Sequence, residues 1–391
     1  MVNVLLLLGL AVTPFILAPG HSDMARGPKM AWALVFSLAI AFVSLYRGEL
    51  KPFKNKWAFV LVGFCLLSFY VSPRPEGLKL FDIQSAGFWS WEPLYQGIVF
   101  LLFTISVASI KFNRKMLEDT LGVMTWCGTI MAAIVILQSL HIDQFFEHRF
   151  GTYGYMPGTL GNPNLVGPFL CIVLPIALYQ RERLMAVLMV AGILVTRCDV
   201  STIGLVAVLA TYHGLKGGNW TKYILVAGTI TVLTSGCMYA TMPEFRAKCP
   251  DNERFLTWSQ SIKDVTTPVM QDSKKNYAIT GIGPGSFKYL FHAKNNVGRD
   301  YFVYAHNDFV QVIYELGFAG FIAFMAMLFM VFKRTTTIKD IFLGRTPYVR
   351  RALLTALVGS LVCACGVFTL QIGTHIFYTL TVVGLLYNDT V

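Results

Sequence analysis

Charged residues are scarce in this chain of 391 residues. Lysine, arginine, aspartate and glutamate together make up 14% of it, whereas an ordinary soluble domain contains about 25%. Hydrophobic residues make up 55%, and the mean hydropathy is +0.58. Apolar runs long enough to cross a bilayer recur along the whole length, which is typical of a protein with several transmembrane helices. The composition therefore excludes an ordinary soluble domain.

The sequence signatures of several common sites are also missing. There are eight cysteines but no CxxC pair, and the predicted outer loops contain no DxD pair. The one glycine-rich turn does not end in the GK[ST] of a P-loop. It also follows no clear strand, which a Rossmann turn requires. No internal repeat of 20–50 residues is visible. We therefore expect neither a catalytic metal ion nor a cofactor.

Twelve apolar segments predict an all-α integral membrane protein of about 12 transmembrane helices, with the whole chain, 1–391, forming one polytopic membrane domain. With the N-terminus in the cytoplasm, the short inner loops carry 17 Lys and Arg and the short outer loops carry 6. The positive-inside rule then places both termini in the cytoplasm. Topology thus explains the net charge of +11, and we expect membrane lipids rather than nucleic acid as partners. The twelve segments are 2–18, 30–46, 57–72, 94–110, 121–138, 164–179, 184–196, 200–212, 222–241, 308–332, 351–370 and 372–387.

The main polar insertion is the predicted outer loop 242–303, between the ninth and tenth segments. It has 62 residues, nine of them basic and six acidic. Within it, DNERFLTWSQSIKDV begins with a capping Asp-Asn pair and places Phe255, Trp258 and Ile262 at spacings of three and four. This spacing predicts an amphipathic helix that lies on the outer surface of the membrane.

A glycine-rich turn follows in the same loop. Gly281, Gly283 and Gly285 surround Pro284 in the stretch GIGPGSF. Closely spaced glycines favour a backbone turn whose exposed N–H groups approach an anion closely. We therefore take Gly283 and Gly285 as candidate substrate-binding residues.

A stripe of polar residues opens the tenth segment. Asn307, Gln311 and Glu315 are spaced by four, Asp308 shares their helix face, and His306 precedes the helix. An ionisable group at this depth costs about 2.5–3.5 kcal/mol or more if it faces lipid, so the stripe should face the protein interior. One interpretation is a hydrogen-bonded clamp between helices. The density of polar residues favours the other, a polar cavity that opens to the outer face.

Two arginines on the outer side are candidates for binding phosphate. A guanidinium group matches phosphate oxygens bidentately and stays charged. Arg254 lies on the predicted amphipathic helix, and Arg197 lies in the short outer turn VTRCDVST. The alternative for a lone arginine at a membrane boundary is that it reaches the lipid headgroups.

Four segments of the chain carry a resemblance to a known family. HNDFVQVIYELGFAG resembles the H-N-x-x-x-Q-x-x-x-E-x-G signature of the O-antigen ligase and O-antigen polymerase superfamily of bacterial envelope glycosyltransferases. Upstream, GTLGNPNLVGPFL, ERFLTWSQSI and GIGPGSF are similar to its G-x-x-G-N-P-N, R-x-x-x-W and G-x-G-x-G-x-F elements, in the family's order. The resemblance covers about residues 150–332 and adds Asn162 and Asn164 as candidate substrate-binding residues.

The resemblance implies a membrane glycosyltransferase with an architecture like that of the GT-C class. Its activity would be the transfer of a glycan from undecaprenyl diphosphate to a hydroxyl acceptor, such as lipid A-core or another glycan. The reaction would take place on the periplasmic face of the bacterial inner membrane. It would need no metal, because diphosphate is already a good leaving group. His306 would accept the proton, Arg254 and Arg197 would stabilise the diphosphate, Asn307 and Asp308 would orient the histidine or the sugar, and Gln311 and Glu315 would brace the helix or line the acceptor path.

One departure from the family pattern keeps other functions open. The family usually has Ser-Arg-Gly at the start of the eighth span, whereas this chain has Ser201-Thr202-Ile203-Gly204. Arg197, four residues before Ser201, is the candidate replacement. The sequence does not separate a ligase from a polymerase. Two alternatives of another class are a proton-coupled transporter that uses the polar stripe and a non-catalytic partner of a glycan assembly complex.

Overall fold

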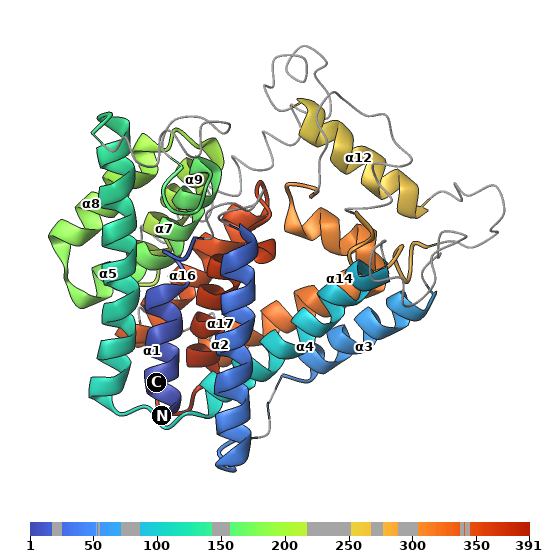
Figure 1. Cartoon of the computed structure of the whole chain (residues 1–391), viewed down its shortest axis with the longest axis horizontal. Coiled ribbons are helices and arrows are strands. Elements are labelled where there is room, and N and C mark those ends of the chain that lie inside the picture. The colour runs from blue at the N-terminus through green and yellow to red at the C-terminus, as the bar shows by residue number, and fades with distance from the viewer. Residues whose placement is uncertain are drawn as a thin grey trace. The chain divides into compact units, whose positions relative to one another are not determined.

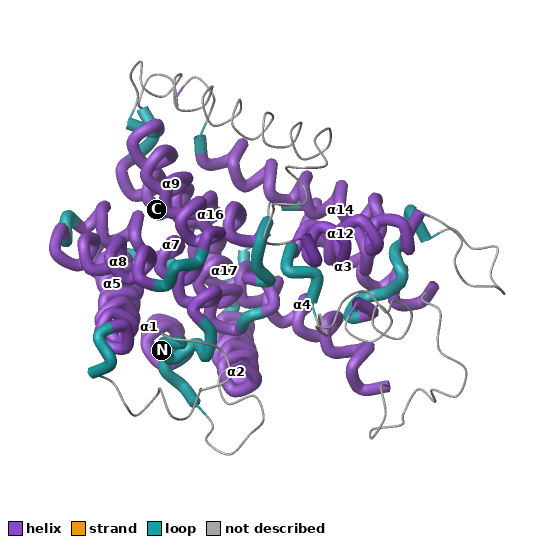
Figure 2. The backbone as a smooth tube through the Cα atoms, turned by 90° about the horizontal axis from the view of Figure 1, so that it is seen from above, coloured by secondary structure: helices purple, strands orange, loops and turns teal. Residues whose placement is uncertain are grey.

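The structure is a computed structural model of the chain, and it describes residues 1–17, 26–51, 53, 55–71, 87–142, 157–216, 252–266, 277–287, 304–336, 340 and 345–391. These residues form α-helices, one short 3-10 helix and loops, with no strand among them (Figures 1 and 2). The helices are α1 (Val2–Val12), α2 (Arg26–Tyr46), α3 (Lys56–Val71), α4 (Gly87–Ser109), α5 (Arg114–Ser139), α7 (Pro163–Gln180), α8 (Arg183–Val195), α9 (Asp199–Gly214), α12 (Asn252–Thr266), α14 (Asp308–Thr335), α16 (Tyr348–Ala364) and α17 (Gly373–Tyr387), with the 3-10 helix Thr369–Gln371 before α17.

The apolar helices support the predicted class of membrane protein. Four of the described helices are long and apolar enough to cross a membrane: Gly27–Tyr46, Arg114–Ser139, Pro163–Gln180 and Asp308–Thr335. Five more apolar helices are shorter, with α1 at 11 residues and α8 at 13. The predicted ninth span, 222–241, and most of the loop 242–303 lie outside the described residues. Twelve full-length spans therefore remain a prediction.

The chain divides into two compact units. Unit 1 consists of Met1–Lys54, Ile98–Lys216 and Val331–Val391, and unit 2 consists of Asn55–Gly97 and Gly217–Met330. The candidate site residues predicted from the sequence are divided between them. Arg197, Asn162 and Asn164 belong to unit 1, and the other eight belong to unit 2.

Helix α7 is the centre of unit 1. It packs against α5, α8, α9, α16 and α17, and the run from Leu165 to Ala177 is buried. Small residues allow this close packing, because a Cβ atom at Gly359 of α16 would lie 2.8 Å from the carbonyl oxygen of Cys171. Figure 1 shows both chain ends at the same end of the unit 1 helices.

Helix α1 is shorter than the predicted first segment, 2–18. It ends at Val12, and side chains from distant parts of unit 1 bind the carbonyl oxygens at and beyond its end. A buried carbonyl group without a partner is costly, so these contacts allow a helix to end inside an apolar bundle. The donors are Tyr378 Oη to Leu10 O (2.7 Å), Thr374 Oγ1 to Thr13 O (3.3 Å), Thr159 Oγ1 to Pro14 O (2.7 Å) and Lys29 Nζ to Ile16 O (2.5 Å).

Candidate functional site

The polar stripe lies at the start of α14 in unit 2. Asn307 caps the helix, because its Oδ1 accepts the N–H groups of Phe309 (3.0 Å) and Val310 (3.1 Å). The next three members of the stripe are buried, with exposed fractions of 2% for Asp308, 4% for Gln311 and 8% for Glu315. The prediction that the stripe faces the protein interior is therefore confirmed.

Helix α14 is broken just after the stripe. Gly317 has φ 69° and ψ −177°, so α14 is two helices joined at this residue and not the single span predicted from 308 to 332. The break leaves backbone groups without partners inside the helix. The segment Tyr277–Phe287, which we call the glycine turn, supplies those partners. The N–H groups of Ile282 and Gly283 donate to Tyr314 O (2.9 Å) and Glu315 O (3.0 Å), respectively. The carbonyl oxygens of Ala278 and Ile279 accept from the N–H groups of Phe318 (2.7 Å) and Ala319 (3.3 Å).

The side chain of Glu315 binds the same turn. The backbone N–H groups of Gly285 and Phe287 donate hydrogen bonds to its carboxylate. Gln311 Nε2 donates to Glu315 Oε1 at 3.0 Å. Three N–H groups thus hold the Glu315 side chain in place, and each such hydrogen bond contributes about 0.5–1.5 kcal/mol net. The buried acid is thus the anchor of the glycine turn.

In this arrangement, groups of α14 accept the hydrogen bonds of the two amides that we expected to bind a substrate anion. The N–H of Gly283 donates to a carbonyl group of α14, and that of Gly285 donates to the Glu315 carboxylate. Ser286 N donates to Gly283 O at 3.1 Å within the turn. The acidic group that contacts the glycine turn is therefore the protein's own Glu315 side chain, and Gly283 and Gly285 shape the turn through their positive φ angles of 126° and 74°.

His306 lies between two fixed residues. On one side, the carbonyl oxygen of Ala305 accepts Trp258 Nε1–H at 2.7 Å, and the N–H of Ala305 donates to Gln311 Oε1 at 3.4 Å. On the other side, Asn307 caps α14. His306 itself is half-buried and has φ 52°, a left-handed conformation that is uncommon outside glycine. Residues held in such conformations cluster at functional sites.

Helix α12 forms where the spacing predicts a helix, from Asn252 to Thr266. Its Trp258 packs on a buried cluster of unit 2 that comprises Val265, Tyr277, Ile282, Phe287, Ala305, Val310 and Tyr314. Leu256 and Ile262 are exposed by contrast, at 53% and 38%. The apolar side chains of α12 are thus divided between the protein core and the surface, and Arg254 lies half-buried one turn before Trp258.

The candidates in unit 1 lie at the starts of two helices. Asn162 caps α7, because its Oδ1 accepts the N–H of Asn164 at 2.8 Å, and Pro163 occupies the first helical position. Arg197 is exposed, with φ 52°, in the turn between α8 and α9. Replacement of the family's missing arginine by Arg197 stays a prediction.

The structure also identifies residues that the sequence analysis left out of the site. Trp258 belongs to the amphipathic spacing and to the R-x-x-x-W element but was not predicted as a site residue, yet its indole fixes the residue before His306. Ser68 of α3 donates to Glu315 O at 2.7 Å, so a third segment supports the break in α14. A serine inside the apolar α3 gives no signal of this contact in the sequence.

Comparison with known proteins identifies no family for this chain. The chain matches no known family model, and it matches no curated protein. The residues that the structure describes include no group of three or more His, Cys, Asp or Glu side chains placed to hold a metal ion. The geometry of unit 2 and the sequence motifs are therefore what indicate the function.

Proposed function

We propose that unit 2 carries the active site of a glycosyltransferase that resembles the O-antigen ligases and polymerases. It moves a glycan from undecaprenyl diphosphate to a hydroxyl acceptor, either a glycolipid such as lipid A-core or the end of another glycan. It works on the periplasmic face of a bacterial inner membrane with both termini in the cytoplasm. Ligase activity is the first candidate and polymerase activity the second, since both use the same donor.

One observation carries this proposal. Three motifs that are separate in the sequence meet along the first half of α14: the R-x-x-x-W element contacts Ala305, next to His306, through Trp258, and the glycine turn contacts Tyr314 and Glu315 of the H-N-x-x-x-Q-x-x-x-E-x-G segment. A lone motif of this kind is a weak signal, but hydrogen bonds between three of them are what a shared site requires.

The chemistry assigned to these residues is a displacement at the anomeric carbon of the donor sugar. The acceptor oxygen forms the new bond to that carbon, the bond to the diphosphate oxygen breaks, and undecaprenyl diphosphate leaves with the electron pair. His306 takes the acceptor proton, because an imidazole changes its charge near neutral pH. Arg254 stabilises the negative charge on the diphosphate.

A proton-coupled transporter is the alternative of another class, because Glu315 and Gln311 form a buried polar pair in α14. A reconstituted assay separates the two functions. The transferase consumes carrier-linked glycan and generates no substrate-dependent current, and a transporter does the reverse.

The role of Arg254 is tested by replacing it with lysine and with alanine. We expect both variants to lower transfer by about 10²–10³-fold, the usual cost of losing one group that stabilises transition-state charge. Lysine should not rescue activity, because it keeps the charge but loses the planar pair of donors. The measurement is the initial rate of transfer at several donor concentrations in proteoliposomes that contain EDTA, since the proposed reaction needs no metal.

Lys263→Ala is the matched control, because Lys263 is an exposed basic residue on the same helix. It should leave the rate within a few-fold of the wild-type value. If Arg254→Lys kept full activity, Arg254 would be a surface residue that does not bind the donor.

A further inference from the structure

A second site, separate from the proposed active site, lies in unit 1 where α1 begins and where α2 and α4 end. A cavity of about 490 Å³ opens there between the start of α1, the loop 47–51 and the turn 109–111. Three of its lining residues are basic, namely Arg47, Lys51 and Lys111, and one is acidic, Glu49. The lining therefore carries an excess of positive charge.

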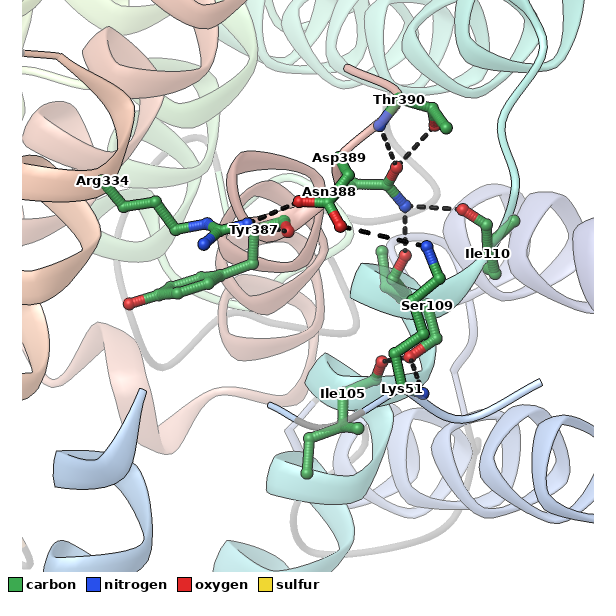
Figure 3. A network of polar contacts seen from close by, with 10 residues as sticks. Lys51, Ile105, Ser109, Ile110, Arg334, Tyr387, Asn388, Asp389 and Thr390 are labelled. Atoms are coloured by element: carbon green, nitrogen blue, oxygen red, sulfur yellow. Dashed lines mark hydrogen bonds and ion pairs between the residues drawn. The ribbon is translucent and has the colours of Figure 1, made fainter. Parts of the chain in front are cut away.

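The contacts of these residues neutralise the charge only in part. Arg47 Nη1 lies 3.5 Å from Glu49 Oε1. Lys51 Nζ lies 4.0 Å from Asp389 Oδ2, but Asp389 forms its shorter ion pair with Arg334, at 2.6 Å (Figure 3). Lys111 is exposed. An anion in this cavity would therefore meet three basic groups, of which Arg47 is paired with Glu49 and Lys51 shares Asp389 with Arg334.

The walls of the cavity are fixed by hydrogen bonds. Gly48 ends α2 in a left-handed conformation, and the N–H of Glu49 donates back to Ser44 O at 2.9 Å. The N–H of Lys51 donates to Ser109 Oγ at 2.9 Å, which ties the loop to the end of α4. Asn388 Nδ2 donates to Val107 O (3.1 Å) and Ile110 O (2.6 Å), so the C-terminal segment holds the same turn (Figure 3). The backbone that carries the basic side chains is thus already ordered, so less conformational entropy is lost when a ligand binds.

A mostly apolar recess and an apolar surface adjoin the cavity. A smaller cavity of about 200 Å³ shares Lys51 and Ser109 with it and is also lined by Phe53, Ala108, Tyr387, Arg334 and Asp389. On α2, one turn before Arg47, Phe42 is 70% exposed and Leu45 is 65% exposed, on a helix apolar enough to cross a membrane. A ligand that matches this basic cavity and the adjoining apolar surface has an anionic headgroup and an apolar tail.

We propose that this cavity binds the phosphate of an anionic phospholipid. Arg47 and Lys111 contact the phosphate oxygens, Lys51 adds a third positive charge, and the glycerol and first acyl carbons extend toward the smaller cavity and the apolar face of α2. Basic pockets between membrane helices bind anionic headgroups in this way, and each basic residue strengthens binding to an anionic surface.

The test uses the purified full-length chain and the double variant Arg47→Gln/Lys111→Gln. The control Lys115→Gln/Arg345→Gln removes the same charge from two exposed residues that do not line the cavity. Native mass spectrometry measures the binding of phosphatidylglycerol, with phosphatidylcholine and inorganic phosphate as competitors. We expect one tightly bound phosphatidylglycerol on the wild type and the control, and affinity lowered about thirtyfold in the double variant, from the loss of two basic contacts.

Lys111→Gln alone keeps the test valid if the double variant fails to fold, because Lys111 is exposed, and its affinity should fall about fivefold. Equal affinity of the wild type and the cavity variants would overturn the proposal. So would an equal loss in the control, which would indicate attraction to the general surface charge. Displacement of the lipid by millimolar inorganic phosphate would show a site for a soluble anion and not for a lipid.

Discussion

Replacement of His306 by asparagine is expected to lower glycan transfer by about 10²–10⁴-fold, the usual contribution of a general base. Asparagine is the sharpest substitution here because His306 has φ 52°. Asn tolerates the left-handed conformation better than other non-glycine residues, so the variant removes the imidazole and keeps the backbone. The measurement is the single-turnover rate in proteoliposomes with donor and acceptor at saturation. His306→Ala should lose at least as much activity.

His141 provides a matched control for this substitution. It too is a histidine in the left-handed conformation, with φ 55°, but it lies in unit 1 after α5. His141→Asn should transfer glycan at a rate close to that of the wild type. If His306→Asn instead keeps activity within a few-fold of the wild-type rate, another group takes the proton and the mechanism above is wrong.

Gly317→Ala is expected to disrupt the core of unit 2. A Cβ atom at this position would lie 2.3 Å from the carbonyl oxygen of Ile279 and 2.6 Å from the amide nitrogen of Gly281. Because both neighbours are backbone atoms, the glycine turn has to move away from α14. The positive φ of 69° with an extended ψ of −177°, a combination open essentially only to glycine, adds about 1–3 kcal/mol, and overpacking adds about 1–3 kcal/mol. We expect the amide hydrogens of Gly283 and Phe318 to exchange at least tenfold faster, with loss of transfer.

The control for this prediction is Gly63→Ala in α3, also in unit 2. No heavy atom lies within 4 Å of a Cβ built at Gly63, and alanine favours a helix by about 1 kcal/mol over glycine. Exchange in Tyr277–Phe287 should therefore stay unchanged. An unchanged exchange rate in Gly317→Ala would mean that the glycine turn does not fill the break in α14.

Short-range sequence patterns predicted those parts of the fold that depend on residues close together in the sequence. The apolar composition predicted a helical membrane protein, and the spacing of Phe255, Trp258 and Ile262 predicted the helix that the structure places at Asn252–Thr266. The spacing of four from Asn307 to Glu315 predicted a stripe that faces inward, and its members Asp308, Gln311 and Glu315 are buried. These features depend on neighbours within two turns of the same helix.

Features that depend on distant partners were not predictable in the same way. The apolar run from 308 to 332 predicted a single span, because Gly317 looks like an ordinary small residue of a membrane helix. It breaks the helix because Ile279 and Gly281, more than 30 residues earlier in the sequence, approach its backbone. The glycine turn likewise looked open to a substrate anion. Its acidic partner is Glu315, and no periodicity in the sequence links Glu315 to the glycine turn.

The most direct test of the central claim is to locate the bound donor. An undecaprenyl diphosphate glycan that carries a photoreactive diazirine on its first sugar is irradiated with the reconstituted protein, and the labelled peptides are mapped by mass spectrometry. Because Arg254 binds the diphosphate and His306 faces the anomeric carbon in the proposed site, we expect labels within Asn252–Trp258 and Tyr304–Asp308. Excess unlabelled donor should remove them. Labelling that is confined to unit 1, or that excess donor does not displace, would contradict a donor site in unit 2.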